Sequence, residues 1–109
     1  MTSPDDLGVT FEELAVRLEE LIELLDAADE RLWLRYMRRG LQHVRERRLA
    51  GATYVLGCYG GENTFSDLVV ARGSESGDST RYLVLNRRLH HLRDSIFRLA
   101  NDIASRSAG

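Results

Sequence analysis

The sequence predicts a small all-α protein, a helical bundle of about four helices with an irregular Gly-Gly turn and a short extended segment. Apolar residues recur at three- and four-residue spacings along most of the chain, which is typical of amphipathic helices. Proline occurs once in 109 residues, so long helices are allowed. The hydrophobic share of 43% is that of an ordinary globular domain.

The length of the chain corresponds to one domain. We expect a flexible N-terminal lead over residues 1–9, a single helical domain over residues 10–105 and a flexible tail over residues 106–109. The polar run GSESGDS, before Arg81, predicts an exposed loop.

The first helix is expected to run from Thr10 to about Ala28. Thr10 and Glu13 have the spacing of a capping box, in which each side chain bonds a free backbone N–H of the first turn. One apolar face follows, made of Phe11, Leu14, Ala15, Leu18, Leu21, Ile22 and Leu25. This face is expected to enter the core.

Two further helices are expected over residues 30–48 and 50–59, with Asp29 as the N-cap of the first. The buried face of residues 30–48 is predicted to consist of Trp33, Tyr36, Met37, Leu41 and Val44. Gly40 lies beside them, and a glycine inside a helix allows a close helix crossing. The shorter helix is expected to place Tyr54, Val55 and Cys58 in the core.

The last helix has the most regular pattern. Its apolar residues alternate spacings of three and four, as in helical bundles and coiled coils. They are Tyr82, Leu85, Leu89, Leu92, Ile96, Leu99 and Ile103. The start of this segment, residues 82–85, is also compatible with a strand, so its boundary is left open.

Charge is segregated along the chain. Residues 1–30 contain ten acidic residues and one arginine, whereas residues 31–48 contain seven arginines and one glutamate. Residues 79–109 contain six arginines and two aspartates. We interpret this layout first as complementarity within the chain, with the acidic first helix beside two basic helices.

The turn at Tyr59-Gly60-Gly61 invites a phosphate-binding interpretation, which its context does not favour. A P-loop needs a lysine, and the chain contains none. A dinucleotide-binding loop needs a preceding strand, whereas a helix is expected here. We therefore expect Gly60 or Gly61 to end the helix in the left-handed conformation.

No catalytic residue, metal site or cofactor is predicted. His90 and His91 are adjacent on a helix and point about 100° apart, so they do not share a ligand sphere. They and His43 are expected at the surface or its boundary. Cys58 lies in an apolar run without a neighbouring base, as a buried free cysteine does.

The same composition excludes several partners. No apolar run reaches the roughly 20 residues needed to span a bilayer, so we expect no membrane association and a cytoplasmic location. The net charge of −2 argues against nucleic acid, despite the arginines of residues 31–48.

Two stretches carry a family resemblance. The run YGGENTFSDLV begins at Tyr59, and NRRLHHLRDSIFRLA begins at Asn86. Together with Trp33, they resemble a family of small bacterial helical proteins of unknown function, which has a YGGxxSFxDLV-like turn followed by an NxxLxxLRxxIFxLA helix. The resemblance implies a compact helical domain and no particular chemistry. Residues 62–64 and Ser66 depart from the residues usual in that family, so no role of the turn's side chains is carried over.

We expect a non-enzymatic protein-binding module, with an immunity- or antitoxin-like role as its concrete form. The small size, the charge segregation and the absence of a catalytic set favour this class. The contact surface is expected to combine the acidic first helix with an exposed turn. The candidate residues are Glu12, Glu19, Glu20, Glu23, Tyr59, Glu62, Asn63 and Asp67.

Two alternatives remain open. The first is a structural homo-oligomer, for instance a homodimer, that pairs through the heptads of the last helix. The second is a small enzyme or ligand-binding protein that uses the turn at residues 59–61 as an anion site, together with Asp67 and Arg93.

Overall fold

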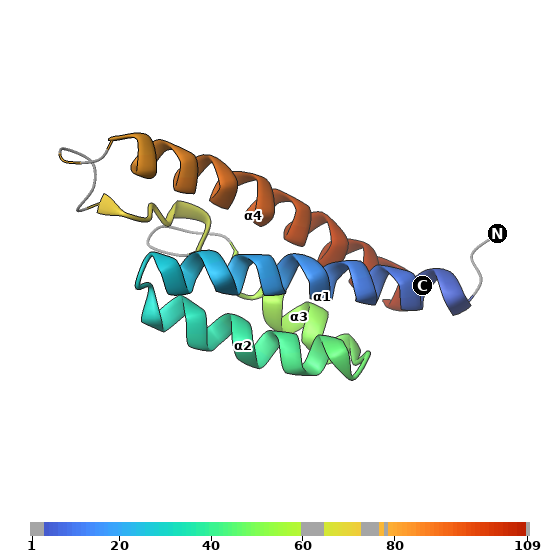
Figure 1. Ribbon diagram of the computed structural model, residues 1–109. Coiled ribbons are helices and arrows are strands. Elements are labelled where there is room, and N and C mark those ends of the chain that lie inside the picture. Colours follow the sequence, from blue (N-terminus) through green and yellow to red (C-terminus); the bar gives the residue numbers. More distant parts are fainter. Residues whose placement is uncertain (1–3, 60–64, 73–76, 78, 109) are drawn as a thin grey trace.

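The computed structural model describes residues 4–59, 65–72, 77 and 79–108. Within these residues the chain forms a compact all-α bundle, as predicted (Figure 1). Its elements are α1 (Pro4–Ala27), α2 (Arg31–Arg45), α3 (Leu49–Leu56), the short 3-10 helix η1 (Phe65–Asp67) and α4 (Ser79–Ala108).

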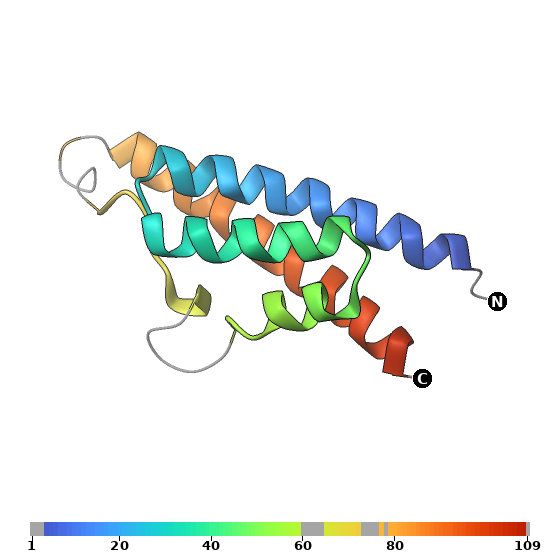
Figure 2. The ribbon, with the colours of Figure 1, turned by 90° about the horizontal axis from the view of Figure 1, so that it is seen from below.

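The helices follow one another around a ring. Helix α1 packs against α2 and α4, and α3 completes the ring by packing against both of those helices. Helices α2 and α4 therefore both border α1: α4 lies above α1 and α2 below it in Figure 1, and Figure 2 shows the same bundle from below. The molecule is elongated, at 51 × 23 × 21 Å, because the long helices α1 and α4 run along most of its length.

Helix α1 begins earlier than the sequence predicted. It starts at Pro4, so the expected start and capping box at Thr10 are wrong. The Thr10 hydroxyl instead donates a bond of 3.0 Å to the carbonyl of Asp6, one turn back in the same helix, and accepts a bond from Arg106. Proline suits the first turn of a helix because the missing N–H has no partner there in any case. The expected end at Ala28 is one residue beyond the observed one.

The turn before α2 uses Asp29 in another way than expected. The N-cap residue of α2 is Glu30, while Asp29 has a left-handed backbone, with φ 59°. Its carboxylate accepts a bond of 2.8 Å from Nε of Arg31. Helix α2 ends at Arg45, before the expected Arg48, because the chain turns at Arg47, whose φ is 55°.

Two glycines set the approach of α2 and α3. A Cβ atom at Gly40 would lie 3.0 Å from Cγ2 of Val55, so the close crossing predicted at Gly40 is confirmed. Gly51 is tighter still, since a Cβ there would lie 2.8 Å from the backbone nitrogen of Val44. Backbone atoms cannot turn aside as a side chain can, so only glycine fits at position 51.

Aromatic side chains of α2 extend this crossing. The Tyr36 and Tyr54 rings stack with centroids 4.3 Å apart, and the Tyr36 hydroxyl donates to the carbonyl of Tyr54. Burial raises the pKa of Tyr36 to about 12. Trp33 is half-buried, and the centroid of its ring lies 5.4 Å from that of Phe65. Helix α2 therefore also supports the segment that follows α3.

Helix α3 ends before the glycine pair. Its last residue is Leu56, so the prediction that Gly60 or Gly61 ends the helix is wrong. Gly57 follows in a right-handed conformation, with φ −62°. Residues 60–64 lie outside the described residues.

Helix α4 is helical from Ser79 onwards, which settles its open boundary in favour of a helix. Its heptad face supplies four residues to the core: Leu89, Leu92, Ile96 and Ile103. They meet the face of α1 that contains Leu14, Leu18, Leu21 and Leu25, all of them fully buried. Because this face is already covered inside one chain, pairing between copies through the same heptads would require the bundle to open.

Candidate functional site

Three of the four candidate glutamates on α1 bind arginines of the same chain. These contacts join α1 to the basic segments on both of its sides. The ion pairs are Glu12–Arg47 at 3.0 Å, Glu19–Arg45 at 2.6 Å and Glu20–Arg88 at 3.2 Å. Three acidic side chains of α1 are therefore paired with arginines of the same chain.

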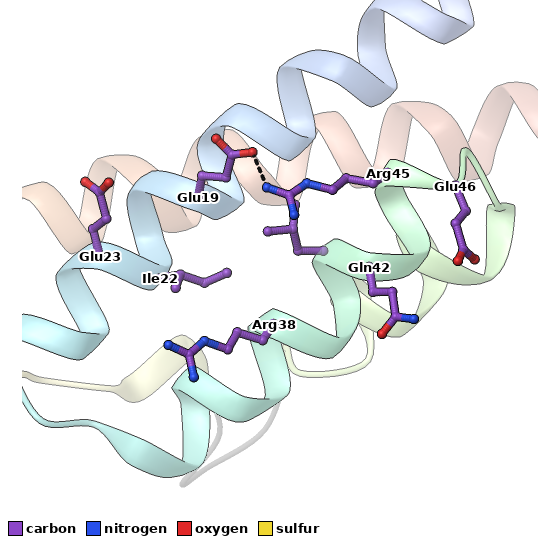
Figure 3. A pocket seen from close by; sticks show the side chains of 8 residues that line it. Glu19, Ile22, Glu23, Arg38, Gln42, Arg45 and Glu46 are labelled. Atoms are coloured by element: carbon purple, nitrogen blue, oxygen red, sulfur yellow. Dashed lines mark hydrogen bonds and ion pairs between the residues drawn. The ribbon is translucent and has the colours of Figure 1, made fainter.

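Glu23, the fourth candidate glutamate, lies on one wall of a surface groove between α1 and α2. Arg38 stands on the other wall, and no ion pair joins the two (Figure 3). Ile22 and Leu41 supply the apolar part of the lining. The groove has a volume of about 700 Å³, and we call it the charged groove. Its residues are Glu19, Ile22, Glu23, Arg38, Leu41, Gln42, Arg45 and Glu46.

The seven arginines of residues 31–48 fall into two groups. Four of them are paired with carboxylates of the chain: Arg31, Arg45, Arg47 and Arg48. Among the described residues, Arg35, Arg38 and Arg39 have no ion pair or hydrogen bond from the guanidinium group. These three are exposed and lie within about one turn of α2. We call them the basic face.

The ion pairs themselves contribute little to stability. Their side chains are largely exposed, and exposed pairs are typically worth about 0–1 kcal/mol. Their main effect is to remove net charge from α1. After this pairing, Arg35, Arg38 and Arg39 on α2 and Glu13 and Glu23 on α1 remain without an ion pair among the described residues.

The candidate turn residues are placed differently. Tyr59 is half-buried, and its hydroxyl donates a bond of 2.7 Å to the carbonyl of Arg93. Its ring packs between Phe65 and Phe97, with centroid distances of 5.6 and 5.2 Å. Burial raises the pKa of Tyr59 above its ordinary value. The structure thus gives Tyr59 an architectural role, where we had expected an exposed one.

The other turn candidates divide between described and undescribed residues. Asp67 is exposed at the end of η1, and the residue is not without an interaction partner. Glu62 and Asn63 lie outside the described residues.

Two side chains of α4, one heptad apart, bond to the backbone of residues 65–70. Nη1 of Arg93 donates to the carbonyls of Phe65 and Leu68, at 3.0 and 3.1 Å. Asn86 bonds both backbone groups of Val70, since its Oδ1 accepts from the N–H and its Nδ2 donates to the carbonyl, each at 2.9 Å. We call Asn86 and Arg93 the clamp.

The clamp explains two residues of the stretches that carried the family resemblance. Asn86 and Arg93 stand at the Asn and Arg of the NxxLxxLR pattern. Arg93 bonds two residues of the FSDLV end of the turn, and Asn86 bonds Val70, the residue after it. The guanidinium of Arg93 already bonds two carbonyls, and the hydroxyl of Tyr59 bonds a third. An anion site built on these two residues would have to compete with those bonds.

Cys58 lies in unfavourable surroundings for a nucleophile. Cys58 is buried, its thiol donates to the carbonyl of Val55 at 3.0 Å, and burial raises its pKa to about 12. A thiol with this pKa is almost entirely protonated near neutral pH, whereas nucleophilic cysteines need the thiolate. The prediction of a buried free cysteine is confirmed.

The histidines lie where they were expected. His90 and His91 are exposed on α4, and His43 is half-buried at the end of α2. In the part of the chain that the structure describes, no three His, Cys, Asp or Glu residues are grouped so that they could hold a metal ion. Of the helices described, none is both long and apolar enough to cross a bilayer.

Sequence reasoning did not separate the paired arginines of α2 from the unpaired ones. The sequence shows which helix carries the charge, but pairing depends on how each helix is rotated against its neighbours. The i, i+3, i+4 spacing of residues 35, 38 and 39 was the available signal, because it places them on adjacent turns. Gly51 was missed because a glycine near the start of a short helix has no distinctive pattern.

Comparisons of the chain with protein-family models, with curated proteins and with solved structures gave no match.

Proposed function

We propose that the protein is a non-enzymatic binding module that recognises an acidic segment of another protein through the basic face of α2 and the charged groove between α1 and α2. The observation that carries the proposal is the unpaired state of Arg35, Arg38 and Arg39, beside glutamates that are mostly paired. Guanidinium groups form bidentate bonds with carboxylates, and arginine is enriched at protein interfaces.

An apolar contact is available next to this charge. Leu32 lies one turn before Arg35 and is 67% exposed. Ile22 and Leu41 line the neighbouring groove. A partner with carboxylates around an apolar side chain would therefore match α2 in both charge and polarity.

Glu23 gives the surface a means of discrimination. It faces Arg38 across the groove without pairing to it, so a partner that offers a cation to Glu23 and a carboxylate to Arg38 is favoured over a uniformly acidic one. Charged contacts of this kind raise association rates and exclude wrong partners more than they add affinity.

An immunity- or antitoxin-like role is the concrete form of this proposal. Such a protein acts by covering a surface of its target, and needs no catalytic group of its own. The small size of the chain, the buried Cys58 and the bonded Arg93 support a role of this kind.

The proposal is tested by site-specific photo-crosslinking in lysate of the native cells. A photoreactive residue replaces Gln42, which lines the charged groove, and in a control protein it replaces Ser105, which is exposed near the end of α4. We expect one protein to crosslink at position 42 and not at position 105. The product should disappear at high salt and with Arg38→Gln.

Equal crosslinking at both positions, or a product that salt and Arg38→Gln leave unchanged, would contradict the proposal. A small molecule that co-purifies with the protein in place of a protein partner would favour the ligand-binding alternative.

A further inference from the structure

A second exposed surface lies on the outer face of α4. It shares no residue with the basic face or the charged groove. Its residues follow helical spacing along about three turns and surround a shallow hollow of about 470 Å³. They are Thr80, Leu83, Val84, Arg87, Arg88 and His91. We call this surface the α4 stripe.

The apolar part of the stripe is not used by the core. Leu83 and Val84 are 60% and 59% exposed, whereas Leu85 and Leu89 turn inwards and pack on the bundle. Single exposed leucines and valines are ordinary on protein surfaces. Here two of them are adjacent, and they form the apolar part of a hollow whose other side chains are polar.

The charged part of the stripe is entirely basic. Among the described residues, Arg87 has no ion pair or hydrogen bond from its guanidinium, and it lies one turn after Leu83 and Val84. Arg88 is held by Glu20 of α1 at 3.2 Å, and His91 is exposed one turn further on. The stripe contains no carboxylate of its own.

We propose that the α4 stripe docks an acidic amphipathic helix of another protein. Apolar side chains of that helix would cover Leu83 and Val84, and a carboxylate one turn along would bind Arg87. An amphipathic helix presents apolar and acidic residues at this spacing on one face. The charge complementarity argues against a second copy of this chain, because two stripes in contact would bring Arg87 and Arg88 of one copy against the arginines of the other.

The position of the stripe makes this proposal independent of the α2 surface. Helices α2 and α4 both border α1 and lie apart from each other in Figure 1, so a helix docked on the outer face of α4 leaves α2 accessible. If both surfaces are used, the protein bridges two acidic segments, and two linked segments of one partner would bind much more tightly than either alone.

The test uses a synthetic probe peptide of about four helical turns, with leucine at i, i+3, i+4 and i+7 and glutamate beside them. Binding is measured by fluorescence anisotropy, and the contact surface by ¹H–¹⁵N NMR of the folded protein. We expect saturable binding that shifts the amides of residues 80–91. Arg87→Glu should weaken it about tenfold, as should replacement of Leu83 and Val84 by glutamine.

Matched controls separate this surface from unspecific charge. Arg98→Glu changes the net charge by the same amount on the same helix, at a side chain that pairs with Asp94, and should leave the affinity unchanged. Arg38→Glu, on α2, should also leave it unchanged. A peptide of the same composition with its leucines spread around the helix should bind at least about tenfold more weakly.

Several results would overturn the proposal. The first is that the peptide does not bind saturably. The second is that Arg98→Glu and Arg87→Glu weaken peptide binding equally. The third is that the peptide shifts amide signals of α2 alone. A dimer of the protein that Leu83→Gln dissociates would overturn it too, because a second copy would then be the occupant. Failure of this proposal would not affect the proposal for the α2 surface, because the crosslinking at position 42 tests that surface separately.

Discussion

Polar contacts hold helix α4 to the bundle along two edges. On the edge that faces α1, these are exposed arginine contacts such as the ion pair Arg88–Glu20. On the other edge, the clamp residues bond to the backbone of residues 65–70. On the first edge, contacts with water and dissolved ions can replace the ion pairs. The second holds backbone carbonyl and N–H groups that need a partner once they are partly buried.

This difference indicates where evolution can change the surface without cost to the fold. Charges along α1, α2 and the outer face of α4 can vary at little cost in stability, so they are free to serve recognition. The clamp cannot vary in this way, because each lost bond leaves a backbone group without a partner.

The largest effect is expected for Arg93→Ala. The variant loses two charge-assisted bonds to the carbonyls of Phe65 and Leu68, so the free energy of unfolding should fall by about 3 kcal/mol. Urea denaturation measures the loss. The control is Arg98→Ala on the same helix, whose pair with Asp94 is exposed and 3.4 Å long. Equal losses in the two variants would contradict the distinction between the two edges.

Asn86→Ala should lower the free energy of unfolding by about 2 kcal/mol, because both backbone groups of Val70 lose their partner. Asn86→Asp sharpens the test, since it keeps the acceptor for the Val70 N–H and removes the donor to the Val70 carbonyl. The aspartate variant should also be less stable than the native protein. Native stability in this variant would mean that the donor bond is unimportant.

The segment after α3, whose Cys58 carbonyl accepts a bond from the N–H of Phe65, should also respond to alkaline pH. The folded chain keeps Cys58 protonated up to its raised pKa of about 12, whereas the unfolded chain releases the proton near the ordinary value of 9.0. Stability is therefore complete below pH 9 and falls as the pH rises towards 12, by about 1 kcal/mol at about pH 10. Thermal unfolding at several pH values measures this fall. A Cys58→Ala variant with the same pH dependence as the native protein would refute this assignment.

Tyr59→Phe should cost about 1 kcal/mol, because it removes one hydrogen bond, to the carbonyl of Arg93, and keeps the ring between Phe65 and Phe97. Tyr59→Ala should cost clearly more, since the ring contacts are lost as well. If the two variants lose the same stability, the ring packing does not contribute as described.

The smallest effect is expected on the charged edges. In a double-mutant cycle with Glu19→Gln and Arg45→Gln, the coupling free energy should be below about 1 kcal/mol and should vanish at high salt. A large coupling that salt does not reduce would show that this exposed pair is structural after all.

The sequence was sufficient for the fold where periodicity carries the information. The apolar spacing of α1 and α4 predicted the buried leucines, because a helix exposes one face every 3.6 residues whatever its neighbours are. Gly40 was identified for the same reason, since it interrupts a buried face.

The boundaries were predicted less well, because several capping signals compete. Thr10 with Glu13 fits a capping box, yet the helix continues back to Pro4, where a proline followed by two aspartates suits the first turn equally well. The candidate site could be predicted only as charged helices. Which arginines stay unpaired depends on the rotation of α2 against α1, and no local pattern contains that information.

The most direct measurement compares two triple variants in affinity capture from native lysate at low salt. One variant replaces Arg35, Arg38 and Arg39 by glutamine. The other replaces Glu12, Glu19 and Glu20 by glutamine. The basic face is predicted to hold the partner, so the arginine variant should lose a stoichiometric protein that the glutamate variant keeps. Loss of the partner from the glutamate variant, with retention by the arginine variant, would contradict this account and place the contact on α1.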